Sequence, residues 1–173
     1  MLDCVKWRSF RIGDVFVILP GKRLRKEDMT AGAKPFIGAS DSNNGVTAFV
    51  ANSNASEDSN VLGVNYNGSV VESFYHPYTC LFSDDVKRFK LREHEGDEYI
   101  YNFLKTVILL QKVKYTYGYK FNEQRMYQQK INLPVDEFGN PDYEFMREYS
   151  RGIEDERRFE ALSYFVAKLE GRA

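Results

Sequence analysis

VLGVNYNGSVVESFY, residues 61–75, is the stretch that decides the fold of the first half of this sequence. Its Asn67-Gly68 dipeptide lies between two runs of β-branched and aromatic residues, and it suits the positive-φ positions of a tight hairpin turn. We therefore predict an antiparallel hairpin with arms at residues 61–66 and 69–75. The first half of the chain is then expected to be mostly antiparallel sheet.

Further strands are expected on both sides of the hairpin. They are short apolar, β-branched or aromatic runs next to turn residues such as Asn44-Gly45 and Ser83-Asp84-Asp85. The run that follows His76-Pro77 is expected to be buried. The predicted strands span residues 10–18, 35–37, 46–50, 78–82 and, in the second half, 130–136.

Helical periodicity begins after these strands. In DEYIYNFLKTVILLQKV, residues 97–113, apolar residues recur at helical spacing, and Asp97 is well placed to cap the first turn. A short helix is expected to start at Asn122. A further helix is predicted after Asn140 as its cap and Pro141 as its first residue.

That last helix carries an apolar stripe with a gap. Gly152 and the charged run at residues 154–158 interrupt the stripe, so one long helix with a weak middle and two helical segments both stay open. The helix is expected to end near Gly171. An apolar stripe on a projecting helix needs a partner, either the flank of its own domain or another chain.

Together these elements predict the α+β class. The expected architecture is a β-rich domain with short helices over residues 1–139, followed by a C-terminal helical segment over residues 140–173. A chain of 173 residues is long enough for one domain with a core and too short for two ordinary ones.

Charge and composition exclude several classes of protein. A formal net charge of -1 argues against a protein that coats nucleic acid by charge alone. No run approaches the roughly 20 apolar residues needed to cross a bilayer, and the first ten residues lack the core of a signal peptide. Cys4 and Cys80 have neither the number nor the spacing of a disulfide framework or zinc site. We therefore expect a cytoplasmic protein without a membrane segment.

No catalytic machinery is expected either. NPDY, residues 140–143, is similar to the Asn-Pro-Pro-Tyr loop of amino-methyltransferases but departs at its third position, and a helix start explains it fully. Asp84-Asp85 is more typical of a turn than of a metal site. His76 and His94 have no visible nucleophile to activate, and Cys80 is expected to be buried. We expect no cofactor and no metal.

Cations and rings are the groups that remain to be explained. KYTYGYKFNEQRM, residues 114–126, alternates four aromatic rings with cations around one glycine, a mixture that no amphipathic helix shows. Other basic residues gather at residues 22–26 and 87–92. Each cluster taken alone is more often a solvated surface than a binding site.

Four segments, in order along the chain, give these clusters a context. They resemble the target-recognition domain of restriction-modification specificity subunits, the DNA-reading S subunits of type I systems and their type IIB relatives. The last segment, with its Leu-Pro strand and Asn-Pro-Asp helix start, is the most specific. The segments are KWRSFRIGDVFVILPGKRLRKEDM (6–29), PFIGASDSNNGVTAF (35–49), NVLGVNYNGSVVESFYHPYTCLFSDDV (60–86) and YGYKFNEQRMYQQKINLPVDEFGNPDYEFMREY (117–149).

The resemblance implies a domain that reads DNA and a conserved-region helix that docks an adenine methyltransferase subunit. Affinity for DNA comes largely from cations on phosphates, and specificity comes from directional donors and acceptors at base edges. Aromatic rings can pack on sugars, thymine methyls or an extruded base. The predicted DNA-binding residues are Lys22, Arg23, Arg25, Lys26, Asn43, Asn44, Tyr66, Asn67, Tyr117, Tyr119, Lys120, Asn122, Gln124 and Arg125.

Members of the family usually carry two target-recognition domains and two helices, whereas this sequence shows one of each. We therefore expect a half-subunit that reads a two-part site by pairing with a second copy or with another specificity chain. An antiparallel pair of the last helices would bury the stripe. The predicted dimer residues are Ile153, Phe159, Leu162, Val166 and Leu169. Double-stranded DNA, a methyltransferase subunit, a restriction subunit and a second copy are the expected partners.

Two other functions stay open at this point. One is a protein-interaction module that docks on the methyltransferase without binding DNA, and the other is a stand-alone DNA-modifying enzyme. Structural roles are also open for Asn43 and Asn44, as turn residues, and for the rings of residues 114–126, of which two of the four are expected in the core. The recognised base sequence and the choice between type I and type IIB are not readable from the chain.

Overall fold

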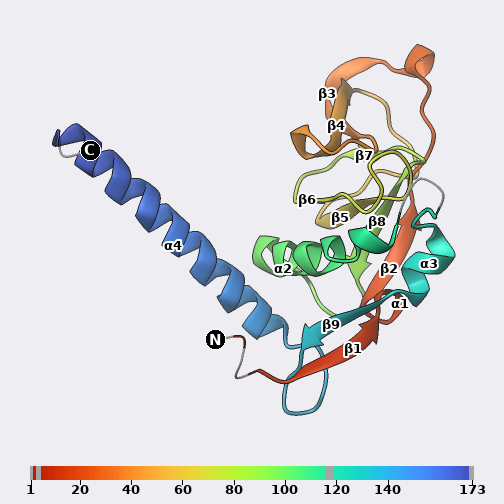
Figure 1. The fold of residues 1–173 in the computed structure, drawn as a ribbon. Helices are drawn as coiled ribbons and strands as arrows, with labels where there is room; N and C mark the ends of the chain where they lie inside the picture. Colours follow the sequence, from red (N-terminus) through yellow and green to blue (C-terminus); the bar gives the residue numbers. More distant parts are fainter. Residues whose placement is uncertain (1, 3–4, 116–118, 172–173) are drawn as a thin grey trace.

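The computed structural model describes residue 2 and residues 5–115 and 119–171, and it shows an α+β domain from which one long helix projects (Figure 1). Nine strands form the sheets of the described domain. Their bounds are β1 (Trp7–Arg11), β2 (Phe16–Pro20), β3 (Ala31–Ile37), β4 (Val46–Val50), β5 (Val61–Asn65), β6 (Ser73–His76), β7 (Leu81–Phe82), β8 (Val86–Leu91) and β9 (Lys130–Pro134).

The strands are arranged in three small sheets. A four-stranded sheet has the order β2-β8-β5-β6, a three-stranded sheet has the order β4-β3-β7, and β1 pairs with β9. All pairs are antiparallel except β3 with β7, which is parallel. The prediction of a mostly antiparallel first half is therefore confirmed, with one parallel pair as the exception.

The hairpin is present, but its predicted two-residue turn is wrong. β5 and β6 pair antiparallel with Val61 opposite His76, and residues 66–72 form a longer loop between them. Gly68 has a positive φ of 59°, as the dipeptide suggests. The arm predicted from residue 69 is diverted because Val70 and Val71 are buried in the main core instead of continuing the strand.

Two other strand predictions also need correction. The strand predicted at residues 10–18 is divided by the single helical turn α1 (Ile12–Val15), which buries Ile12 and Val15. The strand predicted at residues 78–82 is shortened to β7, preceded by an isolated bridge between Asp58 and Cys80. The runs at 35–37 and 46–50 lie in β3 and β4 as predicted.

The helices follow the sequence signals closely. α2 (Glu98–Leu109) begins at its predicted cap, because the Asp97 carboxylate accepts a hydrogen bond from the Ile100 amide at 3.0 Å. α3 (Glu123–Gln128) likewise begins after Asn122, whose side chain accepts from the Arg125 amide at 3.0 Å. Both predictions are confirmed.

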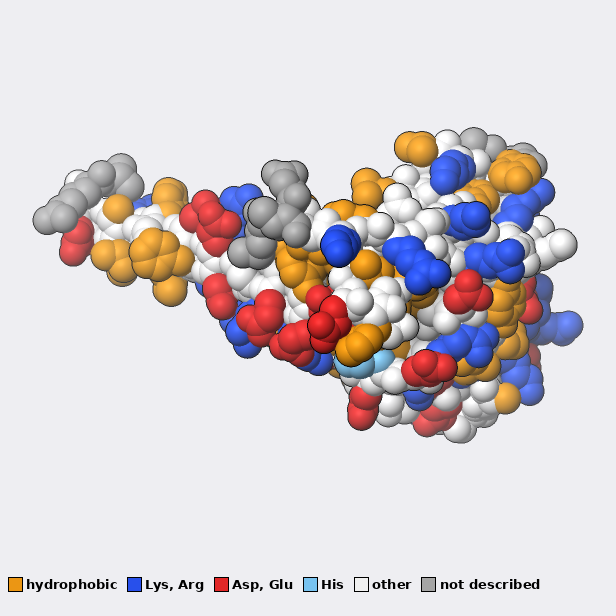
Figure 2. All heavy atoms as spheres, turned by 90° about the horizontal axis from the view of Figure 1, so that it is seen from below, with side chains coloured by type: hydrophobic (Ala, Val, Ile, Leu, Met, Phe, Trp, Pro, Cys, Tyr) orange, Lys and Arg blue, Asp and Glu red, His pale blue; other side chains and the backbone are white. Residues whose placement is uncertain are grey.

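The last helix, α4 (Tyr143–Leu169), is one continuous helix. Its predicted cap is wrong by two residues, because Asp142, and not Asn140, accepts from the Phe145 amide at 2.9 Å. Arg147 fastens the base of α4 to α2 by donating from Nε to the Asp97 carboxylate at 2.6 Å. Beyond this base the helix leaves the domain (Figure 1), and hydrophobic side chains gather on its far half (Figure 2).

The main hydrophobic core lies between the four-stranded sheet and α2. Ile131 and Leu133 of β9 and Met146 of α4 complete it from the side of the projecting helix. Phe121 and Met126 are also buried there, so the segment around α3 is tied to the core. Burial of this apolar surface is the dominant stabilising contribution to the domain.

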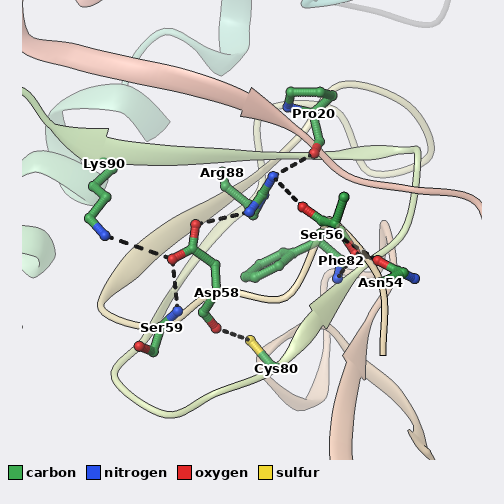
Figure 3. Close-up of polar contacts among 10 residues, drawn as sticks. Pro20, Asn54, Ser56, Asp58, Ser59, Cys80, Phe82, Arg88 and Lys90 are labelled. Atoms are coloured by element: carbon green, nitrogen blue, oxygen red, sulfur yellow. Dashed lines mark hydrogen bonds and ion pairs between the residues drawn. The ribbon is translucent and has the colours of Figure 1, made fainter. Parts of the chain in front are cut away.

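A buried ion pair holds the four-stranded sheet to the 51–60 segment (Figure 3). Arg88 of β8 donates to the Asp58 carboxylate at 2.9 Å, and the side chains of the two residues are 7% and 15% exposed. The same guanidinium donates to the carbonyl oxygens of Pro20 at 2.9 Å and Ala55 at 3.3 Å. Arg88 therefore joins β8, the end of β2 and the 51–60 segment in one place.

We predict that Arg88→Met destabilises the domain by about 3–5 kcal/mol, because it removes the hydrogen-bonded partner of the buried Asp58 carboxylate and leaves it with the longer ion pair to Lys90 at 3.8 Å. Urea denaturation at pH 7, followed by circular dichroism, measures the loss. Arg25→Met is the matched control, because the pair of Arg25 with Glu27 is exposed on both sides and should matter little. Equal stability of the two variants would show that the buried pair is not a structural anchor.

His76 gives a second prediction. The ring is buried, and this burial, with a smaller effect of the Lys105 charge, lowers its pKa from 6.5 to about 4. Between those pH values the unfolded chain binds a proton that the folded chain does not, so stability falls as the pH falls from 6.5 to 4. The loss approaches about 3 kcal/mol at most. The free energy of unfolding, measured by urea denaturation between pH 6.5 and pH 4, should fall less with pH for His76→Phe than for the wild-type protein. The same dependence on pH in both proteins would contradict a lowered pKa of His76.

Candidate functional site

The basic loop, residues 21–30, leads from β2 to β3 and exposes four cations. Its start is fixed by two backbone hydrogen bonds, from the Gly21 amide to the Val86 carbonyl and from the Lys22 amide to the Phe82 carbonyl. A Cβ on Gly21 would lie 1.9 Å from the Ser83 carbonyl oxygen, so only glycine fits against this neighbour. The exposed cations are Lys22, Arg23, Arg25 and Lys26.

The turn at residues 83–85, between β7 and β8, is where the predicted loops meet. Arg23 lies 3.7 Å from the Asp84 carboxylate. The Asn67 side-chain amide donates to the Asp85 carboxylate at 2.9 Å, and the Tyr66 backbone amide donates to the Asp85 carbonyl at 3.1 Å. The 83–85 turn thus contacts the basic loop and the 66–72 loop at once.

The asparagine pair joins the same assembly from another side. Asn43 and Asn44 are exposed and have φ values of 50° and 52°, a left-handed conformation that asparagine tolerates better than most residues. Their loop is held because the Asn65 side chain donates to the Ser40 carbonyl at 2.9 Å. Ala39 in the same loop packs closely on Gly68. A Cβ on residue 68 would lie 2.6 Å from the carbonyl oxygen of Ala39.

Lys87, at the start of β8, links this assembly to α3. Its Nζ lies 2.9 Å from the Glu123 carboxylate and 5.4 Å from the centre of the Tyr66 ring. Burial raises the pKa of Tyr66, and the charges of Asp85 and Asp84 raise it further. We call the basic loop, the Asn43-Asn44 loop, the 66–72 loop, the 83–85 turn and the segment from residue 119 through α3 the loop platform.

The segment that leads into α3 combines anchoring and exposed groups. The Phe121 ring is fully buried and lies 4.5 Å from the partly buried Tyr115 ring. Tyr119 is half exposed, with the Arg125 guanidinium 3.7 Å from its ring centre. Arg125 also donates to the Lys120 carbonyl at 2.6 Å.

These contacts connect the loops and the helix that carry the predicted DNA-binding residues. Tyr117 lies outside the described residues. Three of the others also hold the platform: Asn122 caps α3, Arg125 braces its own loop, and Asn67 binds Asp85. Gln124 is exposed. The sequence does not reveal that Asp84, Asp85 and Lys87 join these loops, and the one signal in it is their position next to a strand boundary.

Tyr143 of the NPDY segment and Cys80 both lie in packed surroundings. Tyr143 of NPDY stacks on His94 with ring centres 4.4 Å apart, and burial raises its pKa to about 12. Cys80 is buried as predicted, and burial raises its pKa to about 12. Within the described ranges, no three His, Cys, Asp or Glu side chains are placed to share a metal ion. None of the helices described is both long and apolar enough to span a membrane.

The far half of α4 is a second surface. Its apolar residues are exposed, with Phe159 72% and Leu169 88% accessible. A groove of about 520 Å³ lies at its base, between α2 and α4, and Trp7, Phe103 and Ile153 are among the residues that line it. The five predicted dimer residues, Ile153, Phe159, Leu162, Val166 and Leu169, are all exposed in the single chain.

The chain thus combines exposed cations on a loop fixed to a sheet with exposed apolar residues on a projecting helix. Residues 4–162 match the family model described as the type I restriction modification DNA specificity domain. The chain belongs to this family.

Relatives and solved structures agree with that assignment. The chain is 56% identical over 154 residues to the specificity subunit S.BcgI of a type II restriction enzyme from Heyndrickxia coagulans, covering 89% of this chain and 45% of the relative. It is similar in fold to a type I S subunit from M. genitalium, with a TM-score of 0.61, 17% identity and coverage of 93% of this chain and 43% of that one.

A second solved structure, the HsdS subunit from Thermoanaerobacter tengcongensis, gives a TM-score of 0.63 at 14% identity, covering 96% of this chain and 41% of that one. The chain spans a little less than half the length of these proteins. The predicted α+β fold of a target-recognition domain with a C-terminal helix is confirmed by these neighbours.

Proposed function

We propose that this chain is a DNA-specificity component of a restriction-modification system, and that it directs a partner methyltransferase and nuclease to a DNA sequence without catalysing either reaction. The observation that carries this proposal is the loop platform: segments distant in sequence present cations and amide side chains from one rigid base. The family and the name of the 56% identical relative support a specificity role over a catalytic one. In this role the protein acts in the cytoplasm, on double-stranded DNA.

The residues of the platform divide by chemistry into two kinds of contact. The flexible, exposed cations of the basic loop suit phosphates, which bind any sequence and fix the register of the protein on the duplex. Asn43, Asn44, Lys120 and Gln124 carry directional groups that suit base edges. Tyr119, braced by Arg125, offers a half-exposed ring for a sugar or thymine methyl.

The proposed division of labour places DNA reading in residues 1–139 and partner docking in residues 140–173. The exposed stripe on α4 supports this, because a row of apolar side chains in water favours association. We propose an antiparallel pair of α4 helices from two copies, with the methyltransferase docking on the same helical segment. A two-fold pair would present two platforms and favour a palindromic, interrupted site.

Gly152 supports the same pairing. It lies inside α4, where a Cβ would meet nothing within 4 Å, so the fold of the single chain does not require glycine. It lies one heptad before Phe159 and two before Val166, on the same side of the helix. An antiparallel register that sets Phe159 against Leu162 of the partner subunit sets Gly152 against Leu169 of the partner subunit, a small residue against a large one.

The proposed function is tested by co-expressing the chain with an adenine methyltransferase subunit that forms a complex with it, and mapping methylated adenines by sequencing. A single interrupted, palindromic motif is the expected result. Methylation that follows no motif would refute DNA reading by this chain. A complex that forms but neither binds nor methylates DNA would favour a regulator that only docks on the methyltransferase.

Lys120→Ala is expected to separate base reading from phosphate binding. If Lys120 contacts a base, its loss weakens binding to the mapped site by about 1–3 kcal/mol and weakens binding to random DNA much less. Lys26→Ala, in the basic loop, is the comparison and should weaken both equally with a shallower salt dependence. Fluorescence anisotropy at several salt concentrations measures both. The same pattern for the two variants would place Lys120 on phosphate.

Leu162→Glu is expected to abolish self-association, because it puts a charge in the centre of the proposed helix pair. Light scattering should then report half the mass of the wild-type protein, with an unchanged circular dichroism spectrum. Arg157→Glu, on the other side of α4, is the control and should leave the mass unchanged. A wild-type protein that is monomeric at high concentration, both alone and with the methyltransferase, would rule out the homodimer.

A further inference from the structure

A hollow of about 470 Å³ lies between the basic loop and the 83–85 turn, in the middle of the loop platform. Its sides combine cations, an apolar patch and three carboxylates, those of Glu27, Asp84 and Asp85, a mixture unlike a simple phosphate site. Acidic groups repel phosphate, so Asp84 and Asp85 would weaken DNA binding if they served no other purpose. The residues that line it include Arg23, Leu24, Phe36, Ser83, Asp84 and Asp85.

We propose that this hollow receives the major-groove edge of a base that carries an exocyclic amine, cytosine or adenine, and that Asp84 accepts a hydrogen bond from that amine. The inference rests on the proposed function and names one base-reading group within it. Carboxylates are the side chains that pair with the amino group of cytosine, because an ionised carboxylate can only accept hydrogen bonds.

The two carboxylates of the turn differ in how fully they are engaged. Asp85 is committed to the platform, since its side chain accepts from Asn67 and its carbonyl accepts from Tyr66. The described contact of the Asp84 side chain is the ion pair with Arg23 at 3.7 Å, with side-chain exposures of 42% and 75%. Such exposed pairs contribute little and open easily.

A turn-forming role does not account for Asp84. Aspartate usually stabilises a turn by accepting a hydrogen bond from the backbone two residues further on. Here the backbone closes the turn itself, through the Val86 amide and the Ser83 carbonyl at 3.1 Å, and the described hydrogen bonds include none to the Asp84 side chain. The carboxylate is therefore presented to solvent on a turn that is already fixed.

Ser83 also lines the hollow. It is 9% exposed, and its Oγ is buried without a hydrogen-bond partner among the described residues. A buried hydroxyl without a partner is costly, so the packing of the turn alone does not explain this serine. The Ser83 amide donates to the Ile37 carbonyl at 2.8 Å, so the hydroxyl and Asp84 stand on a rigid base.

In this proposal Arg23 exchanges one anionic partner for another when DNA binds. Without DNA it lies near Asp84 and offsets the carboxylate charge. When a duplex approaches, phosphates offer Arg23 a stronger partner, since contacts of arginine with phosphate are frequently bidentate. The carboxylate is left free for the base amine, while Leu24 and Phe36 provide an apolar wall beside the base edge.

The test compares Asp84→Ala with Asp41→Ala, which removes an exposed carboxylate from the neighbouring loop. Each variant, in complex with its methyltransferase, is used to select sites from a randomised duplex library at one salt concentration. For Asp84→Ala we expect the preference for cytosine or adenine to be lost at one position, and at its symmetric mate if the complex is two-fold. The ratio of affinities for the mapped site and for random DNA should fall roughly 5- to 150-fold.

The control variant shows the effect expected of a carboxylate that reads no base. Asp41→Ala should tighten binding to all sequences equally, because it only removes a charge that repels phosphate. The same uniform gain for Asp84→Ala, with every position of the motif unchanged, would overturn the inference and leave the proposed function intact. A wild-type complex that selects no motif would overturn the proposed function itself and the inference with it. Circular dichroism confirms that both variants are folded.

Discussion

The buried pair of Arg88 and Asp58 is the contact on which the arrangement of this domain depends. β8 lies inside the four-stranded sheet, between β2 and β5, so a residue on it is held on both sides. From that position Arg88 reaches the end of β2, where the basic loop begins, and the 51–60 segment. The 83–85 turn immediately precedes the same strand. Loops that are separate in sequence therefore keep a common geometry because a central strand and one guanidinium set their bases.

Much of the fold follows from local signals in the sequence. Asp97 and Asn122 predict the starts of α2 and α3 because a side-chain oxygen at a helix cap acts over only three residues. The hairpin is also predicted from local signals. Its turn is predicted wrongly, because the burial of Val70 and Val71 depends on a core assembled from distant elements. The strand break at α1 has the same cause, since Ile12 and Val15 turn inward to the core. Local propensity loses to long-range packing at these places.

The candidate site shows the same limit more strongly. Residue type and the family resemblance select the cations and amides, but neither reveals that Asp84, Asp85 and Lys87 join their loops, because those contacts link residues far apart in the chain. Nor does the sequence divide the rings of residues 114–126. The structure buries Phe121 and leaves Tyr119 half exposed. The proposed DNA reading depends on this division, because a reading group is selective only when its position is fixed by anchored neighbours.

The central claim is that the loop platform is the surface that reads DNA. Hydrogen exchange of the methyltransferase complex, with and without a duplex carrying the mapped site, tests it most directly. The account predicts that slowed exchange is concentrated together in residues 22–26, 43–45, 66–68, 83–87 and 119–125, and that a duplex of scrambled sequence protects these segments less. Protection confined to the far half of α4 or to β1 and β9, with the loop platform unchanged, would contradict it.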